Sequence, residues 1–452
     1  MATILDSLIG SCVNKLQGII TEEAILILGV EEELRKLQER MKQIQCFISD
    51  AERRGMEDSA VHNWVSWLKD AMYDADDIID LASFEGSKLL NGHSSSPRKS
   101  FACSGLSFLS CFSNIRVRHK IGDKIRSLNQ KLEEIAKDKI FATLENTQSS
   151  HKVSTSELRK SSQIVEPNLV GKEILHACRK LVSQVLTHKE KKAYKLAIIG
   201  TGGIGKTTLA QKKCGGLPLA IKVIARVLAS KDKTENEWKK ILANNVWSMA
   251  KLPKEITGAL YLSYDDLPQH LKQCFLYCIV YPEDWTIDRD YLIRMWVAEG
   301  FVEVHKDQLL EDTGEEYYCE LISRNLLQPV VGSFDQSECK MHDLLRQLAC
   351  YISREECYIG DPTSMVDNNM RKLRRILVIT EKDMVVIPSM GKEEIKLRTF
   401  RTQQNPLGIE KTFFMRFVYL RVLDLADLLV EKIPDCLGNL IHLRLLDLAQ
   451  FA

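Results

Sequence analysis

Residues Gly200–Thr207 read GTGGIGKT and follow directly on the short apolar run Lys195–Ile199. They fit the pattern G-x-x-x-x-G-K-[S/T] in the context it requires, after a predicted strand and before a predicted helix. In such a loop the backbone N–H groups point at phosphate oxygens, and the following helix N-terminus adds partial positive charge. The loop therefore predicts a nucleotide site, with Lys206 on the β- and γ-phosphates and Thr207 as a Mg²⁺ ligand.

The sequence behind this loop is too short for a complete nucleotide-binding domain. A P-loop enzyme also needs an acidic residue at the end of a second strand and a group that orients water. No apolar run that ends in an acid lies between Lys206 and Gly216. A parallel sheet adds each strand through a crossover of a dozen or more residues, so residues 195–213 supply one strand and one helix. We expect a truncated P-loop α/β remnant over residues 166–213, with weak ATPase activity at most.

Upstream of the loop, apolar residues recur in alternating steps of three and four, which places them on one face of a helix. Three such stripes occupy residues 27–48, 61–78 and 117–135. The break at Arg53–Gly55 is short enough to return the chain alongside itself, so the apolar faces can bury one another. The sequence predicts a coiled-coil helical bundle over residues 1–142.

Three further segments are delimited by composition. Residues 91–113 are rich in Ser and Gly and predict a mobile loop within the bundle. Residues 143–165 are polar and rich in Ser and Thr, which is typical of a linker. Residues after the phosphate loop are mainly helical in pattern, and their Pro and Gly breaks predict two modules, at 214–252 and 253–350.

A leucine pattern recurs after 23 positions near the end of the sequence. Its members are Leu420, Leu423, Asp424 and Leu425, followed by Leu443, Leu446, Asp447 and Leu448. Leucine-rich repeats have this period, and about three or more stacked units are needed for stability. We therefore expect a connecting region and incomplete leucine-rich repeats in residues 351–452.

The charge balance and the cysteine pattern exclude several classes of function. Lys and Arg number 62 against 61 Asp and Glu, so no overall positive field exists to hold nucleic acid. The 13 cysteines lack the paired spacing with histidine that binds zinc. No run of 18 or more apolar residues occurs, and no basic segment opens the chain. We expect a cytoplasmic protein with no transmembrane segment and no nucleic-acid partner.

An ordered series of motifs resembles the coiled-coil class of plant nucleotide-binding, leucine-rich-repeat (NB-ARC) disease resistance receptors. Besides the phosphate loop, the series comprises the acidic helix motif Asp76–Asp80, Leu169-Val170-Gly171 at the start of the nucleotide domain, the Gly-Leu-Pro-Leu motif in Gly216–Ala220, Leu262–Pro268 and Cys274–Asp284 in the winged-helix module, and the triplet Met341-His342-Asp343. The resemblance spans nearly the whole chain. It implies a mainly α multidomain protein with the modules described above.

The resemblance also implies a mechanism and a ligand. Receptors of this family are held inactive with ADP bound and assemble after exchange for ATP; by analogy Pro218 lies beside the adenine and His342 beside the phosphates. The candidate nucleotide contacts are Val170, Gly200, Gly202, Gly203, Ile204, Gly205, Lys206, Thr207, Thr208, Pro218 and His342, with Thr207 also on Mg²⁺. The implied partners are a pathogen effector or a guarded host protein, and other receptors or a second copy through the bundle. Peripheral contact with the plasma membrane is a further implication.

The sequence departs from the family pattern in three places. Most of the nucleotide domain, which in the family separates the phosphate loop from the Gly-Leu-Pro-Leu motif, is absent. The N-terminus around Met1–Asp6 only loosely resembles the family's membrane-acting first helix, and the repeat region is short.

Several assignments therefore have alternatives. His342 is a nucleotide contact or a polar residue at a helix start, where Asp343 is a cap or a first-turn acid. The acidic residues Asp76, Asp77 and Asp80 form a solvated helix face, which is the commoner arrangement, or dock onto the repeat region as the resemblance implies.

Three functions compete on these grounds. The chain is a nucleotide-gated immune switch, or it is a nucleotide-independent adaptor or decoy that pairs through its bundle. A non-functional truncated receptor is a further alternative to the switch. An ordinary P-loop NTPase or kinase is disfavoured, because the second acidic strand is missing.

Overall fold

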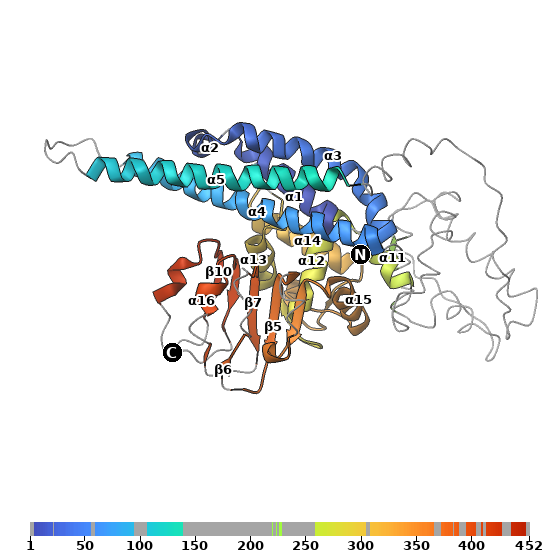
Figure 1. Cartoon of the computed structure of the whole chain (residues 1–452). Coiled ribbons are helices and arrows are strands. Elements are labelled where there is room, and N and C mark those ends of the chain that lie inside the picture. Colours follow the sequence, from blue (N-terminus) through green and yellow to red (C-terminus); the bar gives the residue numbers. More distant parts are fainter. Residues whose placement is uncertain are drawn as a thin grey trace, which may run out of the picture.

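The computed structural model describes residues 4–20, 22–55, 59–94, 106–138, 219, 223, 226–227, 258–303, 308–365, 372–382, 384–387, 395–403, 408–409, 413–426 and 435–448. The predicted phosphate loop with Thr208, the segment around Val170, and Pro218 lie outside these residues. Figure 1 shows a helical bundle along one side of the molecule, with a winged-helix module and a parallel sheet beneath it.

The N-terminal region is the helical bundle that the apolar stripes predict. Its helices are α1 (Ile4–Ile19), α2 (Glu23–Leu28), α3 (Glu31–Gly55), α4 (Ser59–Ser94) and α5 (Leu106–Ala136). Most of the described aliphatic side chains of the stripes are buried, among them Leu34, Leu68 and Leu132, each 0% exposed, while Ile78 and Val117 are partly buried. Burial of such side chains contributes roughly 1.5–3 kcal/mol each, which is why the three faces close on one another.

Two details of the bundle differ from the sequence prediction. The first stripe is divided between two helices, because Gly29 adopts a left-handed φ of 68° and ends α2 before α3 begins. The predicted loop at 91–113 is also shorter, since α4 continues to Ser94 and α5 begins at Leu106. Ser and Gly lower helix propensity without forbidding a helix, so composition alone overestimated the loop.

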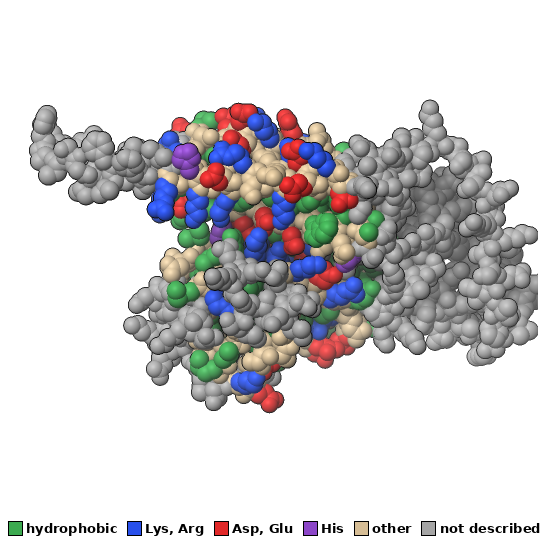
Figure 2. Space-filling view, in the orientation of Figure 1, with side chains coloured by type: hydrophobic (Ala, Val, Ile, Leu, Met, Phe, Trp, Pro, Cys, Tyr) green, Lys and Arg blue, Asp and Glu red, His purple; other side chains and the backbone are tan. Residues whose placement is uncertain are grey.

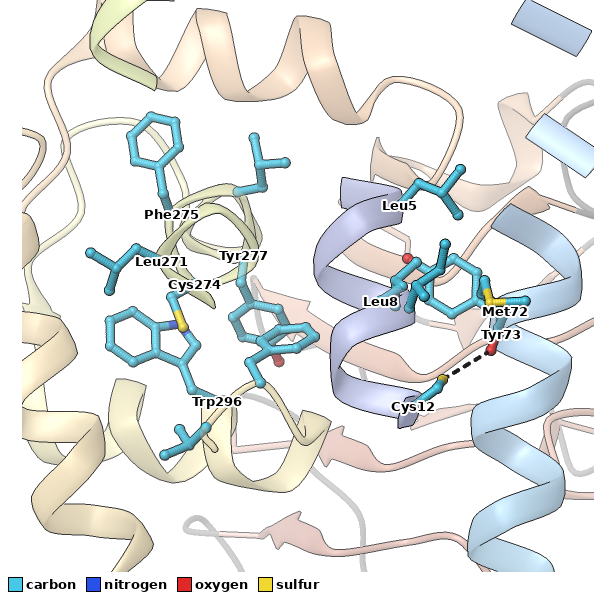
Figure 3. Close-up of a cluster of buried hydrophobic side chains, with 14 of the residues drawn as sticks. Leu5, Leu8, Cys12, Met72, Tyr73, Leu271, Cys274, Phe275, Tyr277 and Trp296 are labelled. Atoms are coloured by element: carbon cyan, nitrogen blue, oxygen red, sulfur yellow. Dashed lines mark hydrogen bonds between the residues drawn. The ribbon is translucent and has the colours of Figure 1, made fainter. Parts of the chain in front are cut away.

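Helix α1 joins the bundle to the winged-helix module. Figure 3 shows α1 between α4 of the bundle and α12 (Gln269–Tyr277) of that module. Leu5 and Leu8 are buried, and the Cys12 thiol donates to the carbonyl oxygen of Met72 at 3.7 Å. The two modules therefore share one hydrophobic core.

The winged-helix module agrees with the sequence prediction. Its elements are α11 (Gly258–Asp265), α12, η2 (Cys278–Val280), β1 (Ile287–Asp288), α13 (Arg289–Glu299), α14 (Leu310–Ser323), β2 (Gln328–Pro329), η3 (Phe334–Gln336), β3 (Glu338–Lys340) and α15 (Asp343–Ser353). The three strands form an antiparallel sheet in the order β1-β3-β2. The run Phe275–Tyr281, with its aromatic side chains, is buried in the core.

Five parallel strands form the C-terminal sheet, which we call the repeat sheet. They are β4 (Cys357–Gly360), β5 (Arg375–Ile379), β7 (Thr399–Gln403), β9 (Val422–Asp424) and β10 (Leu445–Asp447), in the order β10-β9-β7-β5-β4. The remaining elements of this region are η4 (Pro362–Ser364), β6 (Met384–Val385), β8 (Gly408–Ile409), α16 (Phe413–Arg416) and η6 (Asp435–Asn439).

The register of the last three strands of the repeat sheet, β7, β9 and β10, follows the 23-residue period. Leu423 pairs with Leu446 and Asp424 with Asp447, which are the equivalences that the leucine pattern predicts. The sequence identified only these last two strands, because the segments before them replace the leucines with other apolar and polar residues. The sheet accordingly starts earlier along the chain, at Cys357.

Candidate functional site: an acidic helix on a column of arginines

Four arginines stand side by side along one edge of the repeat sheet, and we call them the arginine column. They are Arg374, Arg398, Arg421 and Arg444, each directly before the first residue of a strand. Their backbones form a continuous ladder over 2.7–2.8 Å, in which the N–H of Arg374 donates to the carbonyl oxygen of Glu356 and each later N–H donates to that of the preceding arginine. The parallel register therefore places four guanidinium groups in one row.

Helix α4 crosses this row with acidic residues at a matching interval. Asp70, Asp76 or Asp77, and Asp80 follow one another at helical spacing, and ten residues of α-helix rise about 15 Å. Three steps between neighbouring strands cover about 14 Å. Since these two lengths nearly coincide, α4 can present a carboxylate to each strand of the sheet in turn.

The ion pairs follow this geometry. At the ends of the column, Arg374 Nη2 lies 3.0 Å from an Asp70 oxygen and Arg444 Nη2 lies 2.6 Å from Asp80. In the middle, Arg398 binds Asp76 at 2.7 Å and Asp77 at 2.5 Å. Arg421 contacts all three inner carboxylates. Its guanidinium nitrogens lie 2.9 Å from Asp76, 3.3 Å from Asp77 and 2.6 Å from Asp80.

Most of this network is removed from solvent. The side chains of Arg398 and Arg421 are 3% and 0% exposed, and those of Asp76 and Asp77 are 7% and 6% exposed. The prediction of a solvated acidic face is therefore wrong, and the docking that the resemblance implies describes the structure. Desolvation makes a single buried charge costly, so these groups are stable only as a neutralised set.

The electrostatics keep the carboxylates ionised. Burial by itself would raise the pKa of Asp76, but the charges of Arg421 and Lys15 outweigh it and hold the pKa well below the usual range. The pKa of Asp80 is lowered against burial in the same way. Burial alone would lower the pKa of Arg398, whereas Asp77 and Asp76 raise it well above its usual value.

Two further groups attach to the same carboxylates and guanidinium groups. From α1, the Lys15 Nζ atom lies 2.5 Å from Asp76 and 3.8 Å from Asp80. From the winged-helix module, the backbone oxygen of Glu299 accepts from Arg421 Nη1 at 2.8 Å. That oxygen belongs to the C-terminal turn of α13, where the helix dipole favours a cation. The network thus connects bundle, winged-helix module and repeat sheet.

A second contact lies beside the column. Tyr73 on α4 donates to Glu356 at 2.9 Å, and Lys69 pairs with the same carboxylate. The guanidinium carbons of Arg374 and Arg398 stand 4.6 and 4.7 Å from the centroid of the Tyr73 ring. Such cation–π contacts strengthen when they are desolvated, as they are here.

Of the predicted nucleotide contacts, the described part of the chain contains His342 alone. It is the N-cap of α15, where its Nδ1 accepts the N–H of Leu344 at 3.3 Å, and Asp343 stands in the first turn. The helix-start assignment therefore describes what this histidine does, while contact with phosphate stays a prediction. The arginine column and Lys15 were missed by sequence reasoning. The signal available for them was the 23-residue spacing of arginines.

Comparisons with known proteins agree with this architecture. Residues 8–104 match the family model "Rx N-terminal domain", and residues 280–349 match "Disease resistance protein Winged helix domain". The first segment contains most of α1 and all of α2, α3 and α4 with its acidic residues, and the second contains the strands of the winged-helix module and most of α15. The chain belongs to the plant family of coiled-coil, nucleotide-binding, leucine-rich-repeat disease resistance proteins.

Individual relatives show how far the similarity extends. The chain is 24% identical to the Arabidopsis thaliana protein At1g50180, named for disease resistance, over 97% of this chain and 70% of that one. It is 33% identical to disease resistance protein RGA2 of Solanum bulbocastanum, over 53% of this chain and 22% of the relative. It is 34% identical to disease resistance protein RPP8 of Arabidopsis thaliana, over 52% of this chain and 27% of the relative. The chain thus spans only about a quarter of the two more identical relatives.

The first of these alignments is longer than the chain itself. It extends over 620 positions, whereas the chain has 452 residues, so at least 168 aligned positions have no counterpart in this chain.

Among the described helices, none is long and apolar enough to cross a membrane.

Proposed function

We propose that this protein is an intracellular immune receptor of plant defence whose bundle is restrained by the arginine column until a pathogen effector or a guarded host protein is recognised. The buried pairing of Asp76, Asp77 and Asp80 with Arg398 and Arg421 carries this proposal. It joins the first and last parts of the described chain through charges that lose their partners if the parts separate. A two-state restraint of this kind is what a receptor needs to remain silent.

The proposed switch is exchange of ADP for ATP with Mg²⁺. The phosphate loop at Gly200–Thr208 would hold the phosphates, with Lys206 and Thr207 in the roles given above, and Val170, Pro218 and His342 would complete the site. The support is the motif itself together with the family membership. A nucleotide that binds the restrained and released states with different affinity shifts their populations by that difference alone.

A nucleotide-independent adaptor or decoy is the second candidate. It is favoured by the positions missing from this chain in the long alignment, which we assign to the nucleotide domain behind the phosphate loop. In that case the bundle acts by pairing with another receptor or a second copy once it is free of the column.

A charge exchange tests the restraint. We expect Asp77→Arg to release the bundle and to raise defence signalling in leaf tissue without pathogen, because Arg398 and Arg421 would then face a like charge. Signalling that stays at the wild-type level in Asp77→Arg, with the protein expressed equally, would overturn the proposal.

An equilibrium titration separates the two candidates. Fluorescent ADP is added to the purified 452-residue chain and to Lys206→Ala. Saturable binding that the substitution abolishes supports the nucleotide switch. Absence of binding by a folded chain, with the effect of Asp77→Arg retained, supports the adaptor.

A further inference from the structure

A cavity of about 580 Å³ opens beside the arginine column, between the bundle and the repeat region. Its upper wall is formed by α4 and α5, and its lower wall by the ends of the repeats. This volume is in the usual range of small-molecule sites. Lys and Arg side chains gather along the edge of the bundle that faces the repeat region (Figure 2).

The lining has an excess of positive charge. Four lysines contribute to it, three from α5 and one from the opposite wall: Lys120, Lys124, Lys131 and Lys396. Lys131 and Lys396 share a single carboxylate, that of Asp74. Among the described residues, neither Lys120 nor Lys124 forms an ion pair. Over the described residues, three of the four lysine charges are therefore uncompensated.

The carboxylates of the lining are already engaged elsewhere. Asp77 binds Arg398 and Arg421 of the column, and Asp123 pairs with Arg126 at 2.6 Å. Within the described residues they therefore leave these lysine charges without a carboxylate of their own. Ser127 and Asn439, which also line the cavity, offer neutral hydrogen-bond donors.

We propose that this cavity binds a small polyphosphorylated anion, which bridges Lys120 and Lys124 of α5 to Lys396 of the repeat region. Clustered ammonium groups with nearby hydroxyl and amide donors are the chemistry that binds multiply charged phosphate. Because the two walls come from opposite sides of the dock, the anion binds the docked arrangement and stabilises it by mass action. No residue of the phosphate loop is among those that line the cavity, and the proposal does not depend on the proposed nucleotide switch.

Inorganic tripolyphosphate titrated calorimetrically into the full chain tests the site. Lys206→Ala is present throughout, so that the phosphate loop contributes no binding. We expect saturable binding that weakens as salt is added, since the Debye length is only about 8 Å at 0.15 M ionic strength and shortens at higher salt. Adding Lys120→Gln and Lys124→Gln should weaken it at least about tenfold, because two charge-assisted contacts are lost.

The matched control removes two lysines elsewhere on the bundle. Lys36 and Lys137 are 58% and 73% exposed, so Lys36→Gln with Lys137→Gln changes net charge equally without touching the cavity. The affinity for tripolyphosphate should stay unchanged in this control. Lys396→Gln should weaken binding, as the two α5 substitutions do. Equal weakening in the control, no weakening in the α5 pair, or no binding to the folded chain would each overturn the site.

A parallel sedimentation assay identifies the source of the phosphate. Vesicles that contain phosphatidylinositol bisphosphate are mixed with the same variants. We expect soluble tripolyphosphate to bind and the vesicles not to sediment the chain, since Lys396 lies on the wall opposite α5. A different outcome would overturn the free anion and identify a lipid headgroup as the ligand. In that outcome the vesicles sediment the chain, the Lys120→Gln, Lys124→Gln variant no longer sediments, and tripolyphosphate does not bind.

Discussion

Arg421 donates from Nη2 to an oxygen of Asp80 over 2.6 Å, although the two residues are 341 positions apart in the chain. The same guanidinium reaches Asp76 and the carbonyl oxygen of Glu299 through Nη1. One side chain thus holds the bundle, the winged-helix module and the repeat sheet together. Because its neighbours share partners with it, the contacts in this network form and break together.

Loss of Arg421 should therefore weaken the dock far more than loss of Arg444. Arg421 is fully buried, and Arg421→Ala leaves desolvated carboxylates without their cation, which typically costs about 3–5 kcal/mol. The Arg444 side chain is 34% exposed, and pairs of that kind contribute about 0–1 kcal/mol. Hydrogen exchange of α4 in the two variants measures the difference. Equal protection in both would contradict the buried network.

A glycine beside the network predicts a separable effect of crowding. Gly300 ends α13 at φ 82°, and a Cβ there would lie 3.2 Å from Lys15 Nζ and 3.3 Å from Nη1 of Arg444. Gly332 has φ 92° and nothing within 4 Å of that position. Both Gly→Ala changes cost about 1–2 kcal/mol of backbone strain. Only Gly300→Ala should additionally disturb Lys15, and this should appear as faster proteolysis of α1. If the two variants have the same unfolding free energy and the same proteolysis rate, the crowding argument is wrong.

The sequence predicted those parts of the fold that depend on local pattern. Helical periodicity located the bundle, and the two leucine segments that share a strict 23-residue period located β9 and β10. The strands before them escaped notice because their apolar residues vary, although arginines 398, 421 and 444 keep the same spacing. The dock itself could not be predicted from local pattern, since the arginine partners of Asp76 and Asp77 lie more than 300 positions away. The family resemblance supplied it as an alternative.

The dock should resist mild acid as far as its carboxylates are concerned. Cationic neighbours hold the pKa of Asp76 and Asp80 below the ordinary value of 3.8. A lowered pKa in the folded state gives stability that is present above the unfolded pKa and is lost as pH falls through the folded one. We expect no loss from these groups between pH 7 and about 4.5, followed by opening in stronger acid. Hydrogen exchange of α4 against pH, with Asp76→Asn as the comparison, measures this.

Among the described residues, the group expected to cost stability between pH 7 and 5 is His442, which stacks on Tyr419 with ring centroids 5.6 Å apart. Burial lowers the pKa of His442 below its ordinary value of 6.5, and the charge of Asp77 opposes that effect. The unfolded chain therefore binds a proton that the folded chain rejects, so stability falls as pH drops below about 6.5. The slope from one such group is at most about 1.4 kcal/mol per pH unit.

Replacing this histidine should remove that dependence. In His442→Gln we expect the free energy of unfolding, measured by urea denaturation, to change less between pH 6.5 and 5.5 than in the wild type. His119→Gln is the control, because His119 is exposed on α5. A slope that persists in His442→Gln, or that disappears equally in His119→Gln, would assign the titration to another group. The outcome also bears on the cavity, since His442 lines it and a protonated imidazole there would add to its positive charge.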